Sequence, residues 1–260
     1  MLSFIGMKEN FQWLNNYFDK ILVLTLPRLS DRIENFKKAF DGLNYEFFYG
    51  IDKEETTMES LKDQGLYSTN AYTKFYKRPA EMPHGMLCCS LGHINIYNYI
   101  AVNNFSKTLI LEDDALPVME AIERFPQIIN ELPVGWELFY LGYEKNEMAG
   151  WGKKINRFFL KQFPYHTKLN LSRKIFKNYY AVPVSSLISK AGFHDCTHAY
   201  AVTLEAARKL KEYGRPVSFH PDNLLAYLNC SGELNGYVSR IKLFNQLSAF
   251  DHKIDSLTSD

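Results

Sequence analysis

The chain has 260 residues, of which 46% are hydrophobic and 23% are charged, and its formal net charge is +1. This composition excludes an intrinsically disordered chain, and the length is sufficient for one large α/β domain or two small ones. The first 19 residues contain Lys8 and Glu9 and lack an unbroken apolar core. We therefore expect neither a signal peptide nor a membrane span, and hence a cytoplasmic protein.

The first half of the chain has the pattern of a nucleotide-binding α/β unit. An apolar run at residues 21–26, closed by Pro27, predicts a central strand, and Ser30 is placed to cap a helix over about 31–40. Residues 45–49 predict a second strand that ends at Gly50. The polar stretch from 53 to 78 predicts a lid or a short-helix excursion.

The later elements alternate in the same way. Helices are expected at 87–102, at 119–125 with Pro126 as the stop, and at 204–213; strands are expected from Thr108 to the acidic residues after 111, at 137–141 before Gly142, and at 198–203. This alternation favours a mostly parallel sheet. We see no linker or repeat, and predict a single domain over 1–260 with two halves, at about 20–145 and at about 146–260.

Three consecutive carboxylates, Glu112, Asp113 and Asp114, follow the apolar strand that begins at Thr108. Adjacent carboxylates repel each other unless a cation or a set of donors offsets their charge. In open α/β sheets, ligands bind at the carboxyl ends of strands, so this tip predicts a Mg²⁺ or Mn²⁺ site. The alternative is a solvated acidic turn. Because side chains alternate along a strand, Glu112 and Asp114 should share a face and Asp113 should point away.

The segment from 148 to 194 contains no Asp or Glu but nine Lys or Arg residues interleaved with aromatic rings. We call it the basic strip. One interpretation is a surface for anionic lipid head groups or a phosphorylated acceptor. The other is an insertion that packs its rings on its own domain. The four cysteines, Cys88, Cys89, Cys196 and Cys230, have no Cys-x-x-Cys spacing and are expected to be buried free thiols without zinc or disulfides.

Four separated segments resemble glycosyltransferase family 25, which includes lipopolysaccharide and collagen galactosyltransferases. The segments are Leu24-Thr25-Leu26-Pro27-Arg28-Leu29-Ser30-Asp31-Arg32, Cys89-Ser90-Leu91-Gly92-His93, Leu109-Ile110-Leu111-Glu112-Asp113-Asp114-Ala115, and a group from His198-Ala199-Tyr200 to Pro221-Asp222-Asn223-Leu224-Leu225. The third is the most specific of them. The second has Cys88 where a Gly is usual and Gly92 where a Ser is usual. In the fourth, the usual Pro-Val-Asp-Asp is interrupted after Val217, so that only Asp222 is carried over.

The resemblance implies a GT-A-like α/β fold and inverting transfer of a sugar, with UDP-galactose as the leading donor. It also implies that the half at about 20–145 binds the nucleotide sugar and that the half at about 146–260 lies on the acceptor side. It implies Mn²⁺ or Mg²⁺ as cofactor, held by Glu112 and Asp114, because the charge on a departing diphosphate must be stabilised. The expected donor-binding residues are Pro27, Arg28, Arg32, His93 and Asp113. The expected acceptor is a bacterial surface glycan such as lipopolysaccharide, carried on lipid and reached at the inner membrane face; we expect no nucleic-acid partner.

Asp222 is the candidate general base that takes the proton of the acceptor hydroxyl. Its alternative role is the N-terminal cap of a helix that continues from Asn223. For His93, His220 and His252, a structural or solvent-facing role is favoured over a role as ligands, because these histidines lack any paired spacing. Two other classes of function stay open: a nucleotide- or polyanion-binding module without catalysis, and a metal-dependent phosphohydrolase, for which the sequence lacks a companion His and Asp cluster.

Overall fold

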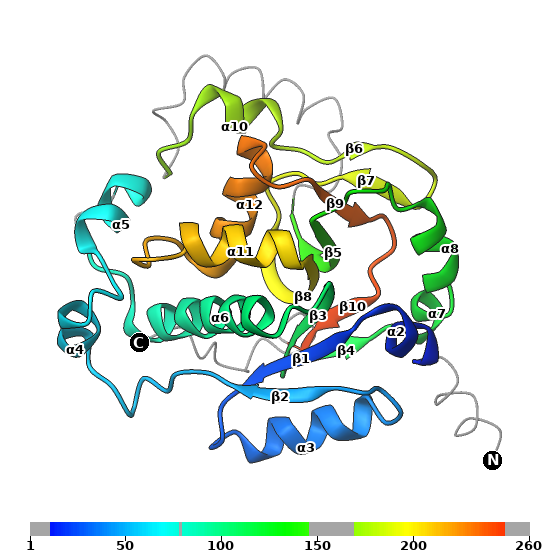
Figure 1. Cartoon of the computed structure of the whole chain (residues 1–260), viewed down its shortest axis with the longest axis horizontal. Coiled ribbons are helices and arrows are strands. Elements are labelled where there is room, and N and C mark those ends of the chain that lie inside the picture. The colour runs from blue at the N-terminus through cyan, green and yellow to red at the C-terminus, as the bar shows by residue number, and fades with distance from the viewer. Residues whose placement is uncertain (1–10, 78–79, 146–168, 248–260) are drawn as a thin grey trace.

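The computed structural model describes residues 11–77, 80–145 and 169–247. It is a three-layer α/β structure around one eight-stranded sheet with the order β2-β1-β3-β8-β5-β9-β7-β6 (Figure 1). The strands of this sheet are β1 (Lys20–Thr25), β2 (Glu46–Tyr49), β3 (Lys107–Glu112), β5 (Leu138–Glu144), β6 (Val182–Pro183), β7 (Ile188–Lys190), β8 (Asp195–Thr203) and β9 (Gly236–Ser239). A separate antiparallel pair is formed by β4 (Ala115–Pro117) and β10 (Phe244–Gln246).

The strand directions confirm a mostly parallel, mixed sheet. β1 runs parallel to both β2 and β3, and β5 runs parallel to β9. β8 lies antiparallel between β3 and β5, and β7 lies antiparallel between β9 and β6. In the described sheet only β8 and β7 therefore oppose the common direction. This α/β architecture agrees with the GT-A-like fold expected from the sequence.

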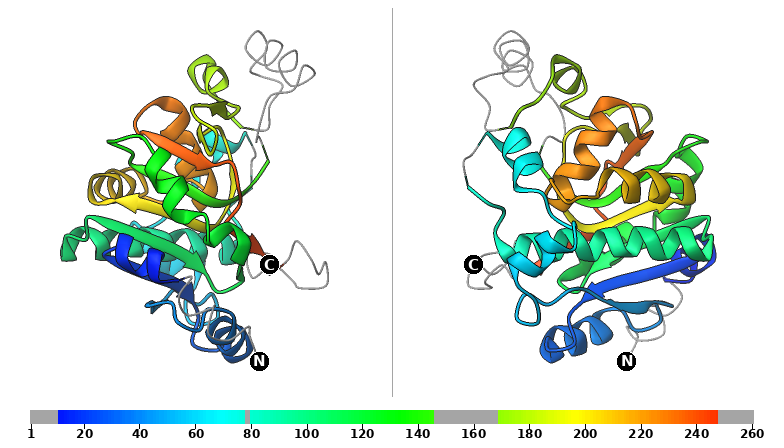
Figure 2. Two further views of the ribbon diagram at one scale, coloured as in Figure 1. Left: turned by 90° about the vertical axis from the view of Figure 1, so that its right-hand side faces the viewer. Right: turned by 60° about the vertical axis from the view of Figure 1, so that its left-hand side comes forward.

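Helices cover both faces of the sheet. One face carries α6 (His84–Asn103), α11 (Leu204–Tyr213) and α12 (Pro221–Ser231), and α6 and α11 lie side by side in Figure 2. The other face carries α2 (Gln12–Tyr17), α3 (Ser30–Ala39), α7 (Met119–Ile122) and α8 (Phe125–Glu131). The remaining helices are α4 (Met58–Asp63), α5 (Thr69–Tyr76) and α10 (Arg173–Lys177).

The central strands are continuous apolar runs because both of their faces are buried. Along β1, Leu22 and Leu24 pack in the core beneath α6, whereas Ile21 and Val23 pack in the core beneath α3. Full burial of an aliphatic side chain of this size stabilises a fold by roughly 1.5–3 kcal/mol. The sheet centre is thus held from both sides, and its strand ends are fixed in position.

The predicted helix ends were wrong in two places. Ser30 is the first residue of α3 and not its cap; the cap position is Leu29, which makes no side-chain cap hydrogen bond. Pro126 does not stop a helix but lies in the first turn of α8, where its missing N–H has no intrahelical partner to lose. The helical segment is therefore interrupted before Phe125, between α7 and α8, and not after it.

Gly142 does not end β5. The strand continues to Glu144 through register shifts on either side of Gly142. A Cβ built on Gly142 would lie 2.2 Å from His198 Nε2, so glycine is needed here for the close approach of two strands. The polar stretch from 53 to 78 forms the short-helix excursion α4 and α5, and the short strands β4, β6, β7, β9 and β10 were not predicted.

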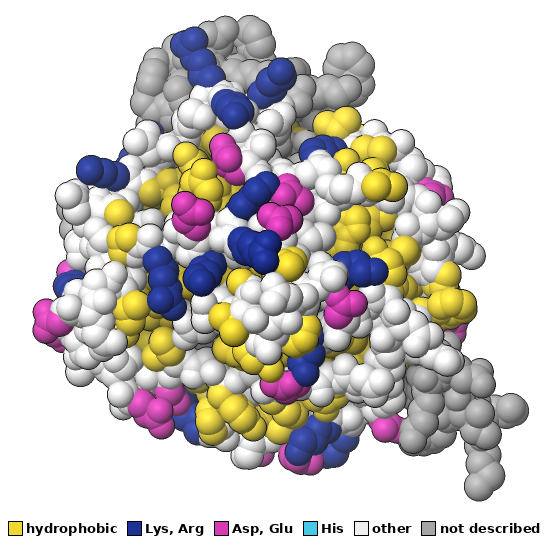
Figure 3. All heavy atoms as spheres, in the orientation of Figure 1, with side chains coloured by type: hydrophobic (Ala, Val, Ile, Leu, Met, Phe, Trp, Pro, Cys, Tyr) yellow, Lys and Arg dark blue, Asp and Glu magenta, His cyan; other side chains and the backbone are white. Residues whose placement is uncertain are grey.

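The described part of the basic strip packs its rings inward. Phe176 and Phe193 are buried, and Tyr179 stacks on Phe193 at a ring distance of 5.3 Å. Its cations on α10, Arg173, Lys174 and Lys177, are exposed at the top of Figure 3, whereas elsewhere on that face Lys and Arg side chains are interspersed with Asp and Glu. The rest of the strip, including Lys153, Lys154, Arg157 and Lys161, lies outside the described residues, as does His252. Among the described helices, none combines the length and apolarity that a membrane crossing requires.

Candidate active site

A cavity of about 290 Å³ opens at the carboxyl ends of β1 and β3. Its walls come from those strand ends, from the first half of α6, from the start of β8 and from the first turn of α12. This is the edge where open α/β sheets bind ligands. The polar residues around it are Thr25, Arg28, Arg32, Lys53, Glu112, Asp113, Asp114, Thr197, Asp222 and Gln246.

Asp113 is held by two donors on its own side of the acidic tip. Its carboxylate accepts hydrogen bonds from Thr25 Oγ1 at 2.7 Å and from Arg32 Nη1 at 2.9 Å. Burial raises the pKa of Asp113, and the hydroxyl and the guanidinium oppose that rise. The pair places a cation from α3 at the cavity wall, so Arg32 and Asp113 reach the cavity as one unit.

Arg28 is paired on the other side of the loop after β1. Its Nε donates to Asp52 Oδ2 at 2.5 Å, and its Nη2 lies 3.5 Å from Glu54 Oε1. This hydrogen bond holds the pKa of the buried Asp52 below its ordinary value. Arg28 lines the cavity, whereas Pro27 is exposed in the turn before it and does not. Pro27 thus lies in the turn outside the cavity, whereas the nearby cations Arg28 and Arg32 line the cavity.

Glu112 points into the site between two elements. Its Oε1 accepts hydrogen bonds from Thr197 Oγ1 of β8 and from His93 Nε2 of α6, the latter at 3.3 Å. Burial raises the pKa of Glu112, but these two donors outweigh it, and the pKa lies below its ordinary value. His93 is 1% exposed and is not among the residues that line the cavity. The structure therefore places His93 behind Glu112 instead of in contact with the cavity.

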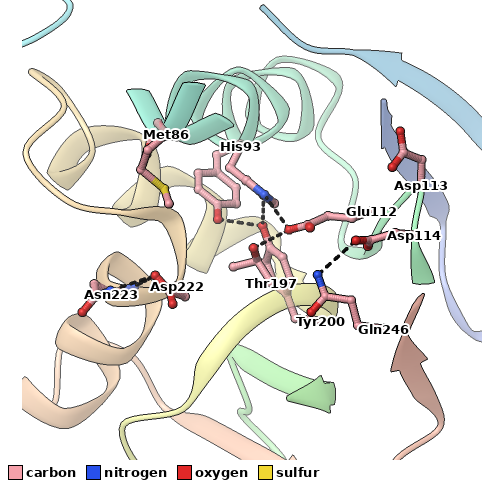
Figure 4. A network of polar contacts seen from close by, with 12 residues as sticks. Met86, His93, Glu112, Asp113, Asp114, Thr197, Tyr200, Asp222, Asn223 and Gln246 are labelled. Atoms are coloured by element: carbon pink, nitrogen blue, oxygen red, sulfur yellow. Dashed lines mark hydrogen bonds and ion pairs between the residues drawn. The ribbon is translucent and has the colours of Figure 1, made fainter. Parts of the chain in front are cut away.

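Asp114 lies on the same side of the chain as Glu112, while Asp113 points the other way (Figure 4). Asp114 Oδ2 accepts a hydrogen bond from Gln246 Nε2 at 3.0 Å. Its Oδ1 is buried and has no hydrogen-bond partner among the described residues. Burial, and after it the charge of Glu112, raise the pKa of Asp114 to about 7. The two carboxylates therefore hold fewer than two negative charges near neutral pH unless a cation joins them.

The unpartnered oxygen of Asp114 is the feature that fits a divalent cation. A buried carboxylate oxygen without a donor is costly, and hard cations prefer such oxygens as ligands. In the described residues, no group of three or more His, Cys, Asp or Glu side chains is arranged to hold a metal ion. Glu112 and Asp114 thus fit a cation that takes its remaining ligands from a bound molecule, and not one held in a closed protein cage.

Asp222 enters the cavity from the first turn of α12. The helix begins at Pro221, and His220 occupies the cap position, so the alternative of Asp222 as the N-terminal cap was wrong. Its Oδ1 accepts hydrogen bonds from the backbone N of Asn223 at 2.7 Å and from the Asn223 side chain at 2.8 Å. Burial, and after it the charge of Asp195, raise the pKa of Asp222. A carboxylate with a raised pKa at a cavity wall can accept a proton.

Three cysteines also line the cavity, Cys88, Cys89 and Cys196, and all described cysteines are free thiols, as expected. Cys88 and Cys230 are buried, whereas Cys89 and Cys196 are partly exposed. Gly92 lets α6 approach β1 closely, because a Cβ at this position would lie 3.2 Å from Leu24 Cδ1. Gly92, one of the two departures from the family pattern in this segment, thus allows close helix-to-sheet packing beside the cavity.

The sequence did not single out Thr197, Tyr200 or Gln246 as site residues. Thr197 and Gln246 stand 85 and 132 positions from the carboxylates that they contact. Neither belongs to a local motif with a chemical signature. The available signal was that Thr197 directly precedes the family-like segment His198-Ala199-Tyr200 and that Tyr200 belongs to it.

The structure is thus that of an α/β protein with a carboxylate-lined cavity at the strand ends of its sheet. The model of glycosyltransferase family 25 (LPS biosynthesis protein) matches residues 18–225, and the chain belongs to this family. It is 26% identical over 205 residues to a glycosyltransferase 25 family member of Anopheles gambiae, covering 73% of this chain and 28% of the relative. It is 23% identical over 146 residues to procollagen galactosyltransferase 1 of Danio rerio, covering 54% of this chain and 24% of the relative.

The chain thus spans about a quarter of the length of these curated relatives. Among solved structures, the crystal structure of A197 from STIV aligns with a TM-score of 0.38 and 8% identity, covering 86% of this chain and 81% of that one. A likeness of this degree says nothing about function.

Proposed function

We propose that this protein is an inverting glycosyltransferase that moves a sugar from a UDP-sugar, with galactose as the leading candidate, to a glycan acceptor. Family membership and the names of the procollagen galactosyltransferases support a sugar transferase. The observation that carries the proposal is the pairing of Glu112 with Asp114, whose Oδ1 is buried without a partner, at the end of β3. Such a pair suits a cation that also binds the oxygens of a diphosphate.

The donor would lie along the ends of β1 and β3. Arg28 and Arg32 bring positive charge to this wall, but Asp52 and Asp113 already offset much of it. A diphosphate carries at least two negative charges, and the cavity also contains Glu112, so these arginines do not balance it alone. When bound, Mn²⁺ or Mg²⁺ at Glu112 and Asp114 would supply the missing positive charge to the departing diphosphate.

Asp222 would act on the acceptor. An acceptor hydroxyl oxygen attacks the anomeric carbon and forms the new C–O bond, while the bond from that carbon to the diphosphate oxygen breaks and UDP leaves with the electron pair. The hydroxyl proton passes to Asp222, whose raised pKa makes it a stronger base than an ordinary aspartate. One displacement without a covalent intermediate inverts the anomeric centre. Asn223 fixes the orientation of Asp222 through its two hydrogen bonds.

The acceptor that we propose is a bacterial surface glycan such as lipopolysaccharide, carried on lipid. The description of the family as an LPS biosynthesis protein supports it, whereas the two relatives named above are animal proteins, one of them a procollagen galactosyltransferase. A lipid-linked acceptor would bring the protein to the inner face of a membrane, where the basic strip would contact anionic head groups. Neutralising Lys153, Lys154, Arg157 and Lys161 together should then weaken binding to anionic vesicles and leave donor hydrolysis intact.

The direct test is calorimetric titration with UDP-galactose, UDP-glucose and UDP-N-acetylglucosamine, with and without Mn²⁺. We expect metal-dependent binding of one donor, and loss of that binding in Asp114→Asn. The control is Asp63→Asn, which removes an exposed carboxylate at the end of α4 that does not line the cavity. It should bind donor like the wild type.

The same assay separates the other classes of function. Binding of a UDP-sugar without any transfer or hydrolysis would indicate a binding module. Rapid hydrolysis of the donor without stimulation by any acceptor would indicate a phosphohydrolase. Failure of all three donors to bind, with and without Mn²⁺, would refute the proposal of a UDP-sugar transferase.

A further inference from the structure

A chain of buried polar side chains leads from the protein core to Glu112. The hydroxyls of Tyr97 and Tyr200 lie 2.7 Å apart, the Tyr200 hydroxyl lies 2.8 Å from His93 Nδ1, and His93 Nε2 lies 3.3 Å from Glu112 Oε1. Thr197 donates to the same carboxylate oxygen. Figure 4 shows His93 of α6 on one side of Glu112, and Thr197 and Tyr200 of β8 on the other.

Burial keeps Tyr97, Tyr200 and His93 out of direct contact with a ligand in the cavity. Tyr97 and Tyr200 are fully buried, His93 is 1% exposed and Thr197 is 6% exposed. Only Thr197 of these four borders the cavity. Buried polar groups are costly unless they are paired, and here each member has a partner. A network of this kind restricts the conformations of the side chain at its end.

When Glu112 is ionised and His93 is neutral, the network has one consistent arrangement of hydrogens. An ionised carboxylate only accepts, so Thr197 and His93 Nε2 must both donate to it. With its single proton on Nε2, a neutral His93 accepts at Nδ1 from the Tyr200 hydroxyl. The oxygen of Tyr200 then accepts from Tyr97. Every hydrogen bond in the chain thus points toward Glu112.

We infer that Thr197, His93 and Tyr200 are positioning residues that hold the Glu112 carboxylate in one orientation for the cation and diphosphate of the donor. The expected effect on donor binding rests on the proposed function, whereas the hydrogen bonds that orient Glu112 do not depend on it. A free glutamate has three rotatable side-chain bonds, and fixing them before binding reduces the entropy lost when a ligand is bound. The partners that orient a ligating side chain typically change affinity by about 10- to 100-fold when they are removed.

The first test compares two tyrosines on neighbouring strands. Tyr140 of β5 is the register partner of Tyr200 of β8, both are fully buried, and the Tyr140 hydroxyl has no hydrogen-bond partner among the described residues. Tyr200→Phe should weaken Mn²⁺-dependent UDP binding by about 10-fold, whereas Tyr140→Phe should leave it unchanged. Equal affinities in the two variants would overturn the inference, because both lose a hydroxyl at the same depth.

Thr197 provides a test by rescue. Thr197→Val keeps the shape of the side chain and removes the donor, so that UDP binding in the presence of Mn²⁺ should weaken by about 10- to 100-fold. Thr197→Ser keeps the hydroxyl and should retain most of the wild-type affinity. If the serine and valine variants bind equally, the hydroxyl does not position Glu112.

A second measurement is independent of any donor. Nitrogen NMR of ¹⁵N-histidine-labelled wild-type protein reports which ring nitrogen carries the proton, and His93→Gln identifies the His93 signal by its disappearance. The inference requires the proton on Nε2, and finding it on Nδ1 would overturn the arrangement. If the wild type bound no UDP-sugar at all, the proposed function would fail, while this tautomer would still decide whether the network is ordered as described.

Discussion

Breaking the Arg32–Asp113 pair should destabilise the fold far more than breaking an exposed ion pair. Arg32 Nη1 lies 2.9 Å from Asp113 Oδ1, and the side chains are 19% and 6% exposed. Removing one partner of a buried pair costs about 3–5 kcal/mol because the other charge stays buried without compensation. In Arg32→Met, the hydrogen bond from Thr25 still reaches Asp113, so we expect the lower end of this range, about 3 kcal/mol.

The assay is urea unfolding of a double-mutant cycle that consists of wild type, Arg32→Met, Asp113→Asn and the double variant. Once the carboxylate is neutral, loss of the guanidinium should cost little, so the coupling free energy should be about 2 kcal/mol or more. The matched control is Arg208–Glu205 on α11, a pair at 2.8 Å whose side chains are 50% and 66% exposed. Its coupling should be about 0.3–0.5 kcal/mol.

A coupling free energy for Arg32–Asp113 as small as that of the exposed pair would refute this reasoning. It would mean that water reaches the pair or that Asp113 is neutral in the native state. The single variant Asp113→Asn distinguishes these two explanations. If Asp113 is neutral in the native state, this substitution should change the free energy of unfolding very little.

Three further predictions concern residues around the cavity. The hydrogen bond from Arg28 lowers the pKa of Asp52 in the folded state. The ionised carboxylate therefore stabilises the fold above its unfolded pKa near 4, and this stabilisation is lost as the pH falls through the lower folded pKa. Unfolding curves of Asp52→Asn should approach those of the wild type as the pH falls below about 4. Gly142→Ala would place a Cβ 2.2 Å from His198 Nε2. Thermal unfolding should show that the free energy of unfolding falls by about 1–3 kcal/mol, whereas a fall below about 0.5 kcal/mol would contradict the close approach. Burial, and after it the charge of nearby carboxylates, raise the pKa of Cys196 to about 12, so its reaction with a thiol reagent at pH 7 should be slow; reaction at the rate of a free thiol would show that the site is open to water.

Much of the fold could be predicted from local patterns. The apolar runs at 21–26 and 108–111 mark β1 and β3, because strands buried on both faces need apolar side chains at every position. The helical periodicity from 87 to 102 lies within α6. The short strands β6, β7 and β10 have two or three residues each, too few for a periodic signal, and they form only because longer neighbours offer an edge.

The candidate site divides in the same way. The sequence by itself determined the acidic tip and its alternation, because a strand places Glu112 and Asp114 on one side whatever surrounds it. Only the tertiary structure decided that β8 pairs between β3 and β5, which brings Thr197 to Glu112, and that β10 brings Gln246 to Asp114. Such pairings depend on the sum of burial and backbone hydrogen bonds over the whole sheet. A local stretch of sequence does not determine this total, so the hydrogen-bond partners of the carboxylates could be identified only from the tertiary structure.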